Sequence, residues 1–243
     1  EAVWAHDRCL VDAFRPAIQP GGWAHPDAVL AQAEQHLALV RLMFCSFDWL
    51  VFTLGLTEAW RSRLDGAVYP LAPGVAGGSF DPARHEFVNF SAAEVSADLN
   101  ELIAKIASVN PQGRLLLTVS PVPLAATCEN QHVWVASTLS KARLRVAADE
   151  AERAHPQVMY FPSYEVITSP AAGSRYYADD LRQVTEAGVK HVMRLFSKHF
   201  MQADTAAPTA PDMEQELRRA QFNSSVVCEE ELIAASAGKP PPV

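Results

Sequence analysis

Three short apolar runs, residues 49–53, 115–119 and 158–161, each end in a turn whose residues could take part in catalysis. Hydroxyl and carboxylate groups can orient a substrate, donate a hydrogen bond or transfer a proton. The residues of these turns are Gly55, Thr57 and Glu58 after the first run, Ser120 after the second, and Ser163, Tyr164 and Glu165 after the third. We expect them to share one site if the three runs lie side by side.

The runs are short and apolar, and the first, residues 49–53, is unbroken and rich in aromatic and β-branched residues. This pattern is typical of strands buried on both faces of a sheet. Helical patterns separate them. Ser91 and Glu94 form a capping box at the start of one helix, and a second helix runs from about residue 137 to 154. This alternation predicts an α/β fold, a three-layer αβα sandwich with a flavodoxin-like parallel sheet. Such sheets bind ligands at the carboxyl ends of their strands.

Two further helices are predicted outside this region. One begins at Pro26, because proline suits a first helical turn, and it places Leu30 and Leu37 on one face. The other begins after Thr185, which has the character of an N-cap residue. Its expected buried face includes Val189 and Met193.

The chain is expected to form one domain over residues 1–202, followed by a tail over residues 203–243. Residues 61–90 are rich in Gly and Pro, and they are either a lid or binding loop or an insertion with a small hairpin. The tail holds seven acids against three bases, a net charge of −4. We expect it to be helical or partly disordered, to contribute no chemistry, and to be the surface for a protein partner or a second copy of the chain.

The composition excludes several functions. The formal charge of −8 over 243 residues argues against a nucleic-acid partner, which would need a basic surface. No phosphate-binding glycine loop and no cluster with metal-ligand spacing occurs, so we expect no cofactor and no metal. No signal peptide and no membrane span is visible, and a cytoplasmic location is expected.

Each candidate side chain also has a purely structural interpretation. Glu58 is either an acid-base or orienting carboxylate or a residue of a surface turn. Ser120, held extended by the proline after it, could bind substrate or brace the turn. His132 stands near the start of a helix and is either a proton acceptor or a structural hydrogen-bonding group. Tyr164 and Glu165 leave the same alternatives open.

Four stretches and one aspartate together match a known family. They are Phe-Thr-Leu-Gly-Leu-Thr-Glu-Ala-Trp (52–60), Thr-Val-Ser-Pro-Val-Pro-Leu (118–124), Ser-Lys-Ala (140–142), Tyr-Phe-Pro-Ser-Tyr-Glu (160–165) and Asp180. With these motifs the chain, over roughly residues 10 to 200, resembles the GSCFA family. This is a bacterial group related to the SGNH hydrolases, which are serine esterases and acyltransferases with an αβα sandwich.

The chain departs from the family pattern at two places. The Gly-Ser-Cys-Phe-Ala box, whose serine stands where SGNH enzymes keep their nucleophile, does not occur in the sequence. By the family's order we expect the box upstream of Glu1, with at least one further strand. The resemblance also implies Asp-x-x-His before the last helix, but Gln183 follows Asp180 at the histidine position. Glutamine cannot accept a proton at neutral pH, so His132 is the substitute candidate, with Asp180 to orient it.

The resemblance implies an esterase or O-acyltransferase that acts on acyl esters of carbohydrate or a surface glycan. Gly55 and Thr57 would then line an oxyanion site, and Glu58 would be a third catalytic residue. The expected substrate contacts are Ser120, Ser163, Tyr164, Glu165 and Gln183. Two alternatives stay open: a glycan-binding domain that has lost the Ser-His-Asp triad, and a scaffold that works through its acidic tail.

Overall fold

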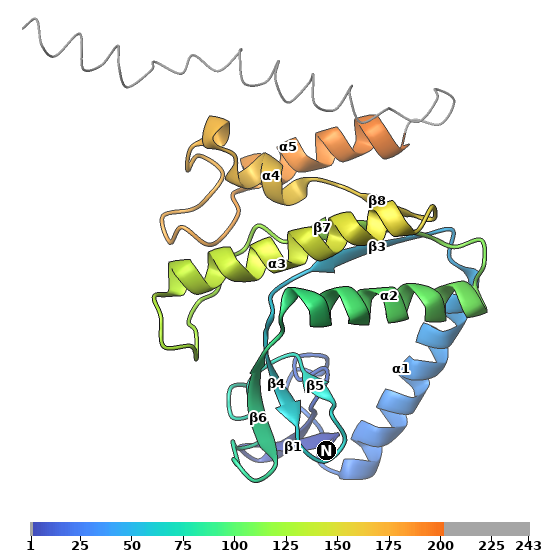
Figure 1. Ribbon diagram of the computed structural model, residues 1–243. Helices are drawn as coiled ribbons and strands as arrows, with labels where there is room; N and C mark the ends of the chain where they lie inside the picture. Colours follow the sequence, from blue (N-terminus) through green and yellow to red (C-terminus); the bar gives the residue numbers. More distant parts are fainter. Residues whose placement is uncertain (1, 202–243) are drawn as a thin grey trace, which may run out of the picture. The chain divides into compact units, whose positions relative to one another are not determined.

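The computed structural model describes residues 2–201 of the chain (Figure 1). The chain divides into two compact units, Glu1–Tyr164 and Glu165–Val243. The division falls inside helix α4 (Ser163–Thr168) and therefore inside the domain predicted over residues 1–202. The predicted tail, residues 203–243, lies outside the described residues.

The first unit contains a parallel sheet of the three predicted strands. They are β3 (Trp49–Leu54), β7 (Arg114–Val119) and β8 (Val158–Tyr160), in the order β3-β7-β8. Both pairs are parallel, which confirms that the three apolar runs are neighbours in one sheet. The carboxyl ends of the strands, and the turns that follow them, therefore meet at one edge of this sheet.

Two helices, α2 (Ala92–Val109) and α3 (Val133–Ala154), pack against this sheet and against each other (Figure 1). Their apolar residues form one buried cluster with Leu115 and Leu117 of β7. Burying one such leucine stabilises the fold by about 2 kcal/mol. The capping box of Ser91 and Glu94 is confirmed at the start of α2.

Strand β3 lies at an edge of the sheet, and the prediction that it is buried on both faces is wrong. The side chains of Trp49 and Val51 are 43% and 51% exposed. Apolar composition alone cannot distinguish a central strand from an edge strand. The Ser120 N–H donates to the Leu54 carbonyl at 2.9 Å, so even-numbered residues of β3 turn their backbone groups toward β7. The odd-numbered residues face the outer edge, where the described part of the chain supplies no strand.

The segment over residues 61–90 belongs to a small antiparallel sheet, as the insertion hypothesis predicted. Its strands, in the order β5-β4-β6, are β4 (Glu58–Ser62), β5 (Val68–Tyr69) and β6 (His85–Asn89). Glu58 thus begins a strand and is not a residue of a loop. A second antiparallel pair, β1 (Val3–His6) and β2 (Cys9–Asp12), was not predicted, because the first residues show no clear periodicity.

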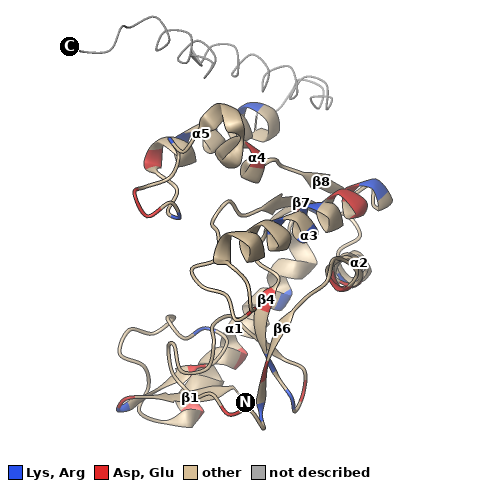
Figure 2. Ribbon diagram, turned by 60° about the vertical axis from the view of Figure 1, so that its left-hand side comes forward, with Lys and Arg blue, Asp and Glu red and all other residues tan. Residues whose placement is uncertain are grey.

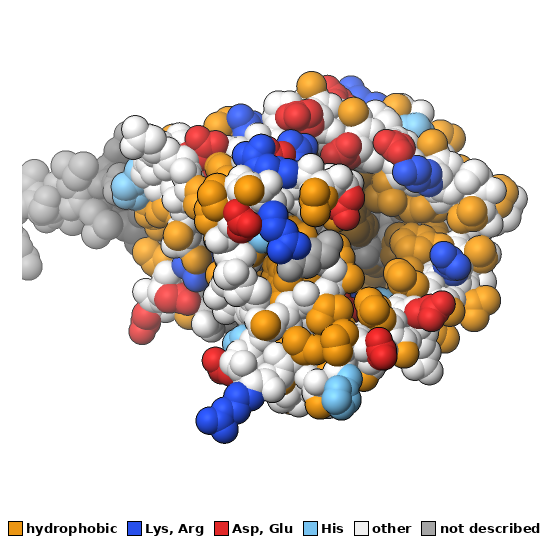
Figure 3. Space-filling model, turned by 90° about the horizontal axis from the view of Figure 1, so that it is seen from below, with side chains coloured by type: hydrophobic (Ala, Val, Ile, Leu, Met, Phe, Trp, Pro, Cys, Tyr) orange, Lys and Arg blue, Asp and Glu red, His pale blue; other side chains and the backbone are white. Residues whose placement is uncertain are grey.

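Helix α1 (Pro26–Ser46) starts at the predicted proline, but its expected buried face is exposed. Leu30 and Leu37 are both exposed, and Val29 is the buried residue of this helix. Figure 3 shows hydrophobic side chains around a hollow on the face seen from below.

In the second unit, Thr185 caps α5 (Glu186–Phe196) as predicted, since its hydroxyl accepts the Gly188 N–H at 3.3 Å. Val189 and Met193 are exposed, so the expected buried face of this helix is wrong as well. The other elements of the unit are the rest of α4, η1 (Pro170–Ala172) and η2 (Ser197–Met201).

Charges of both signs are interspersed along the described ribbon (Figure 2). Within residues 2–201, no helix combines the length and the apolar character needed to cross a membrane.

The open edge of β3 can be tested by NMR hydrogen exchange. We expect the amides of Val51 and Thr53 to exchange faster than those of Phe52 and Leu54, because only the latter two donate to β7. The two even-numbered amides are an internal control within the same strand. Equal protection along β3 would show that its outer edge is paired.

Candidate functional site

The turn from Gly55 to Glu58, which joins β3 to β4, is held by groups that come from distant parts of the chain. The side chain of Thr57 is 1% exposed. Its backbone N–H donates to Ser140 Oγ at 2.8 Å, and its hydroxyl donates to Asn89 Oδ1 at 2.8 Å. Both donors of Thr57 are therefore used inside the protein.

Lys141 reaches the same turn from α3. Its Nζ donates to the Gly55 carbonyl at 2.8 Å, although the residue is only 3% exposed. Within residues 2–201, no carboxylate lies within 4 Å of this ammonium group to form an ion pair. Burial lowers the pKa of Lys141 from 10.5 to about 8. The site thus contains a buried cation without a partner of opposite charge among the described residues.

Asn89, at the end of β6, connects the turn to two charged side chains. Its Oδ1 accepts from Arg143 Nη1 at 2.8 Å, and its Nδ2 donates to Glu129 Oε1 at 2.8 Å. The same Arg143 nitrogen also donates to the Phe90 carbonyl at 3.1 Å. Because this amide is bonded on both sides, it fixes the hydroxyl of Thr57 as an inward-pointing donor.

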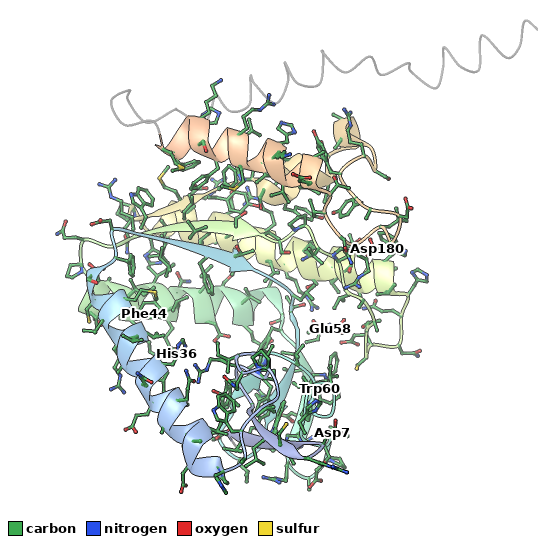
Figure 4. All side chains as sticks on the ribbon, turned by 180° about the vertical axis from the view of Figure 1, so that it is seen from behind. Asp7, His36, Phe44, Glu58, Trp60 and Asp180 are labelled. Carbon is green, nitrogen blue, oxygen red and sulfur yellow. The ribbon has the colours of Figure 1, made fainter. Side chains whose placement is uncertain are left out.

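Glu58 lies at the start of β4 (Figure 4) and holds the loop that follows β7. Its carboxylate accepts from the Thr127 hydroxyl at 2.6 Å and from the Cys128 N–H at 3.4 Å. A carboxylate bonded in this way orients a loop, which supports the orienting role over the role of proton donor.

The turn keeps a backbone donor and a space that the described residues do not fill. The Leu56 N–H has no hydrogen-bond partner among the described residues, and the Leu56 side chain is 39% exposed. A Cβ atom placed on Gly55 would have no heavy atom within 4 Å. The turn therefore offers a backbone donor and free space next to a buried positive charge.

The hydroxyl groups after β7 and β8 brace the backbone. Ser120 Oγ accepts the Val122 N–H at 3.2 Å. Ser163 Oγ donates to the Val119 carbonyl at 3.1 Å and lies 2.5 Å from the Thr118 hydroxyl. Tyr164 is partly buried against the apolar cluster. These residues lie beside the ends of β7 and β8, but their described contacts are structural.

His132 is the N-cap residue of α3, which begins at Val133 and so starts earlier than predicted. The Nδ1 atom of His132 accepts the Trp134 N–H at 3.2 Å. A neutral imidazole with an accepting Nδ1 carries its proton on Nε2, and it has no second lone pair to accept another proton. His132 could act as a base only after releasing this cap.

Asp180, Gln183 and Glu165 belong to the second unit. Asp180 Oδ1 accepts the backbone N–H groups of Arg182 and Gln183, each at 2.9 Å. Both bonds lower the pKa of Asp180, and the bond from the Arg182 N–H has the larger effect. Gln183 is exposed and takes part in this local turn through its backbone. Asp180 is thus an ionised group that closes a loop.

The α3 residues were not among the predicted site residues, although the Ser-Lys-Ala stretch (140–142) carries part of the family resemblance. Ser140 and Lys141 lie 83 and 86 residues from their partners in the turn, so the contacts are tertiary. A second signal was also present: Lys141 falls on the buried stripe of α3, between Ser137 and Leu144, at helical spacing. A lysine at such a position is buried unless its side chain can reach water.

The sequence comparison defines the class of protein. The GSCFA family profile matches residues 2–196, which is most of the chain. The protein belongs to the GSCFA family. No curated protein matches the chain.

The burial of Lys141 can be tested with Lys141→Met, which removes the charge and keeps the length of the side chain. Between pH 8 and 10.5 the unfolded chain holds a proton on this lysine that the folded protein has lost. The free energy of unfolding of the wild type is therefore expected to rise over this range relative to that of the variant, by at most about 3 kcal/mol.

Urea denaturation at several pH values in this range measures the difference. Lys105→Met is the matched control, because the Lys105 side chain is exposed on α2. We expect no comparable rise relative to that variant. A difference between the wild type and Lys141→Met that stays constant with pH would contradict a buried ammonium group.

Proposed function

We propose that the protein is an acyl-ester hydrolase or O-acyltransferase that acts on esters of carbohydrate or a surface glycan. The observation that carries this proposal is the Gly55–Glu58 turn. Its inner polar groups are fixed by Ser140 and Lys141, while the Leu56 N–H and the space beside Gly55 stay open among the described residues. A rigid donor beside a buried positive charge suits an oxygen that gains negative charge during a reaction.

The proposed reaction begins with attack by a serine hydroxyl on the acyl carbonyl carbon. The serine proton passes to a base, and the carbonyl electrons move to the oxygen, which becomes an oxyanion at the turn. When the oxyanion collapses, the bond to the leaving alkoxide breaks, and the alkoxide takes the proton from the base. Water or an acceptor hydroxyl then removes the acyl group by the same steps.

The family relation points to the serine of the Gly-Ser-Cys-Phe-Ala box as the nucleophile. The open edge of β3 supports a place for it, because an exposed apolar edge strand tends to pair with another strand. A strand that carries the box on this edge would bring its carboxyl end beside Gly55. It would also extend the parallel sheet toward the αβα sandwich expected of SGNH-like proteins.

The second candidate is a glycan-binding domain without catalysis. Gln183 at the histidine position favours it, as does the use of Asp180 Oδ1 by two backbone amides. The same turn would then bind the carbonyl oxygen of an acylated sugar and leave the ester intact.

A Gly55→Ala variant tests the proposal. The added methyl group meets no protein atom within 4 Å, so the midpoint of thermal unfolding is expected to stay close to that of the wild type. The methyl group fills the space that a substrate needs. We therefore expect kcat/KM for 4-nitrophenyl acetate to fall by about tenfold or more.

The assay uses the full-length protein, with Leu64→Ala, an exposed position, as the control. Unchanged turnover in Gly55→Ala would exclude the turn as the reacting site. If the wild type binds an acetylated glycan but neither hydrolyses the ester nor transfers the acetyl group, the protein is a glycan-binding domain without catalysis.

A further inference from the structure

Thr57 cannot be the oxyanion donor in this arrangement. Its hydroxyl hydrogen is directed to Asn89 Oδ1, and its N–H is directed to Ser140 Oγ. Asn89 Oδ1 also receives a hydrogen bond from Arg143, which holds it in place. To release either donor of this buried residue would leave a buried polar group without a partner, which is unfavourable.

The peptide group that joins Gly55 to Leu56 differs from Thr57, because its N–H donor is open. The Gly55 carbonyl and the Leu56 N–H belong to one peptide group. The carbonyl accepts from the Lys141 ammonium, and the N–H has no partner among the described residues. A hydrogen bond to the oxygen of an amide withdraws electrons and makes its N–H a stronger donor. A cation has a larger effect than a neutral donor.

Burying a lysine so that it can donate a hydrogen bond to one carbonyl oxygen is energetically unfavourable. A neutral donor could bond the Gly55 carbonyl without burying a charge, and burial of an unpaired charge is unfavourable. The ammonium is retained among the most buried residues of α3, next to Ser140, which fixes the other side of the same turn. The positive charge would polarise the Gly55–Leu56 peptide more strongly than a neutral donor would.

We propose that the Leu56 N–H is the oxyanion donor of the site, and that Lys141 is a positioning residue that polarises the Gly55–Leu56 peptide. This inference rests on the proposed function and assigns the donor within it. The ligand atom is the carbonyl oxygen of an acyl ester, which becomes negative as the ester reacts. The free space beside Gly55 and the partial exposure of Leu56 leave room for that oxygen.

The first experiment does not depend on activity. In an NMR pH titration of the 243-residue chain, the Leu56 amide is expected to shift in one step near pH 8, the pKa of Lys141. The step is expected to vanish in Lys141→Met, or in Lys141→Gln if the first variant does not fold. The Leu71 amide, which also has no described partner, is the control. A Leu56 amide that does not titrate, or that titrates equally in the variant, would overturn the inference.

The second experiment removes the donor. Leucic acid in place of Leu56, in the full-length protein, replaces the N–H by an ester oxygen. We expect kcat to fall by about a hundredfold with little change in KM, and the same change at Leu71 to have no effect. An unchanged kcat would overturn the inference while the proposed function stands. If the Leu56 amide titrates but the wild type shows no ester turnover, the proposed function has failed and Leu56 is not an oxyanion donor.

Discussion

The hydrogen bond from the buried Lys141 ammonium to the Gly55 carbonyl is the interaction on which the candidate site depends. It joins the middle of α3 to the end of β3, across 86 residues of sequence, and places a positive charge at the carboxyl edge of the sheet. Ser140 fixes the next peptide of the turn from the same helix. With both inner contacts in place, the Leu56 N–H remains as a backbone donor without a partner among the described residues. A donor that is held in place in this way is what electrostatic catalysis requires.

Much of the first unit's architecture could be predicted from local patterns. The capping box before α2 and the apolar run of β7 are signals carried by neighbouring residues, and both were correct. The edge position of β3 could not be predicted in this way, because the same apolar run fits a central strand. The β5-β4-β6 sheet was foreseen only as a small hairpin, since its register depends on pairing between distant residues.

The candidate site was predicted only in part. Gly55 and Thr57 were placed correctly after the end of β3, because position after a strand of a parallel sheet is a local signal. Glu58 was expected in the same turn but begins β4. We assign the oxyanion donor to Leu56 instead of Thr57, because both donors of Thr57 are used inside the protein. Lys141 was not predicted as a site residue, because the spacing of residues in a sequence does not show which carbonyl group a helix side chain will contact. Its place in the Ser-Lys-Ala stretch and its position on the apolar stripe of α3 were the available signs.

The most direct test of Leu56 as the oxyanion donor is a crystal structure of the full-length protein after reaction with a fluorophosphonate. The phosphonyl oxygen of the adduct stands in for the oxyanion. We expect a serine to be modified and this oxygen to lie about 3 Å from the Leu56 nitrogen, on the peptide held by Lys141. An adduct whose oxygen is bound by other donors, or no adduct at all, would contradict this assignment.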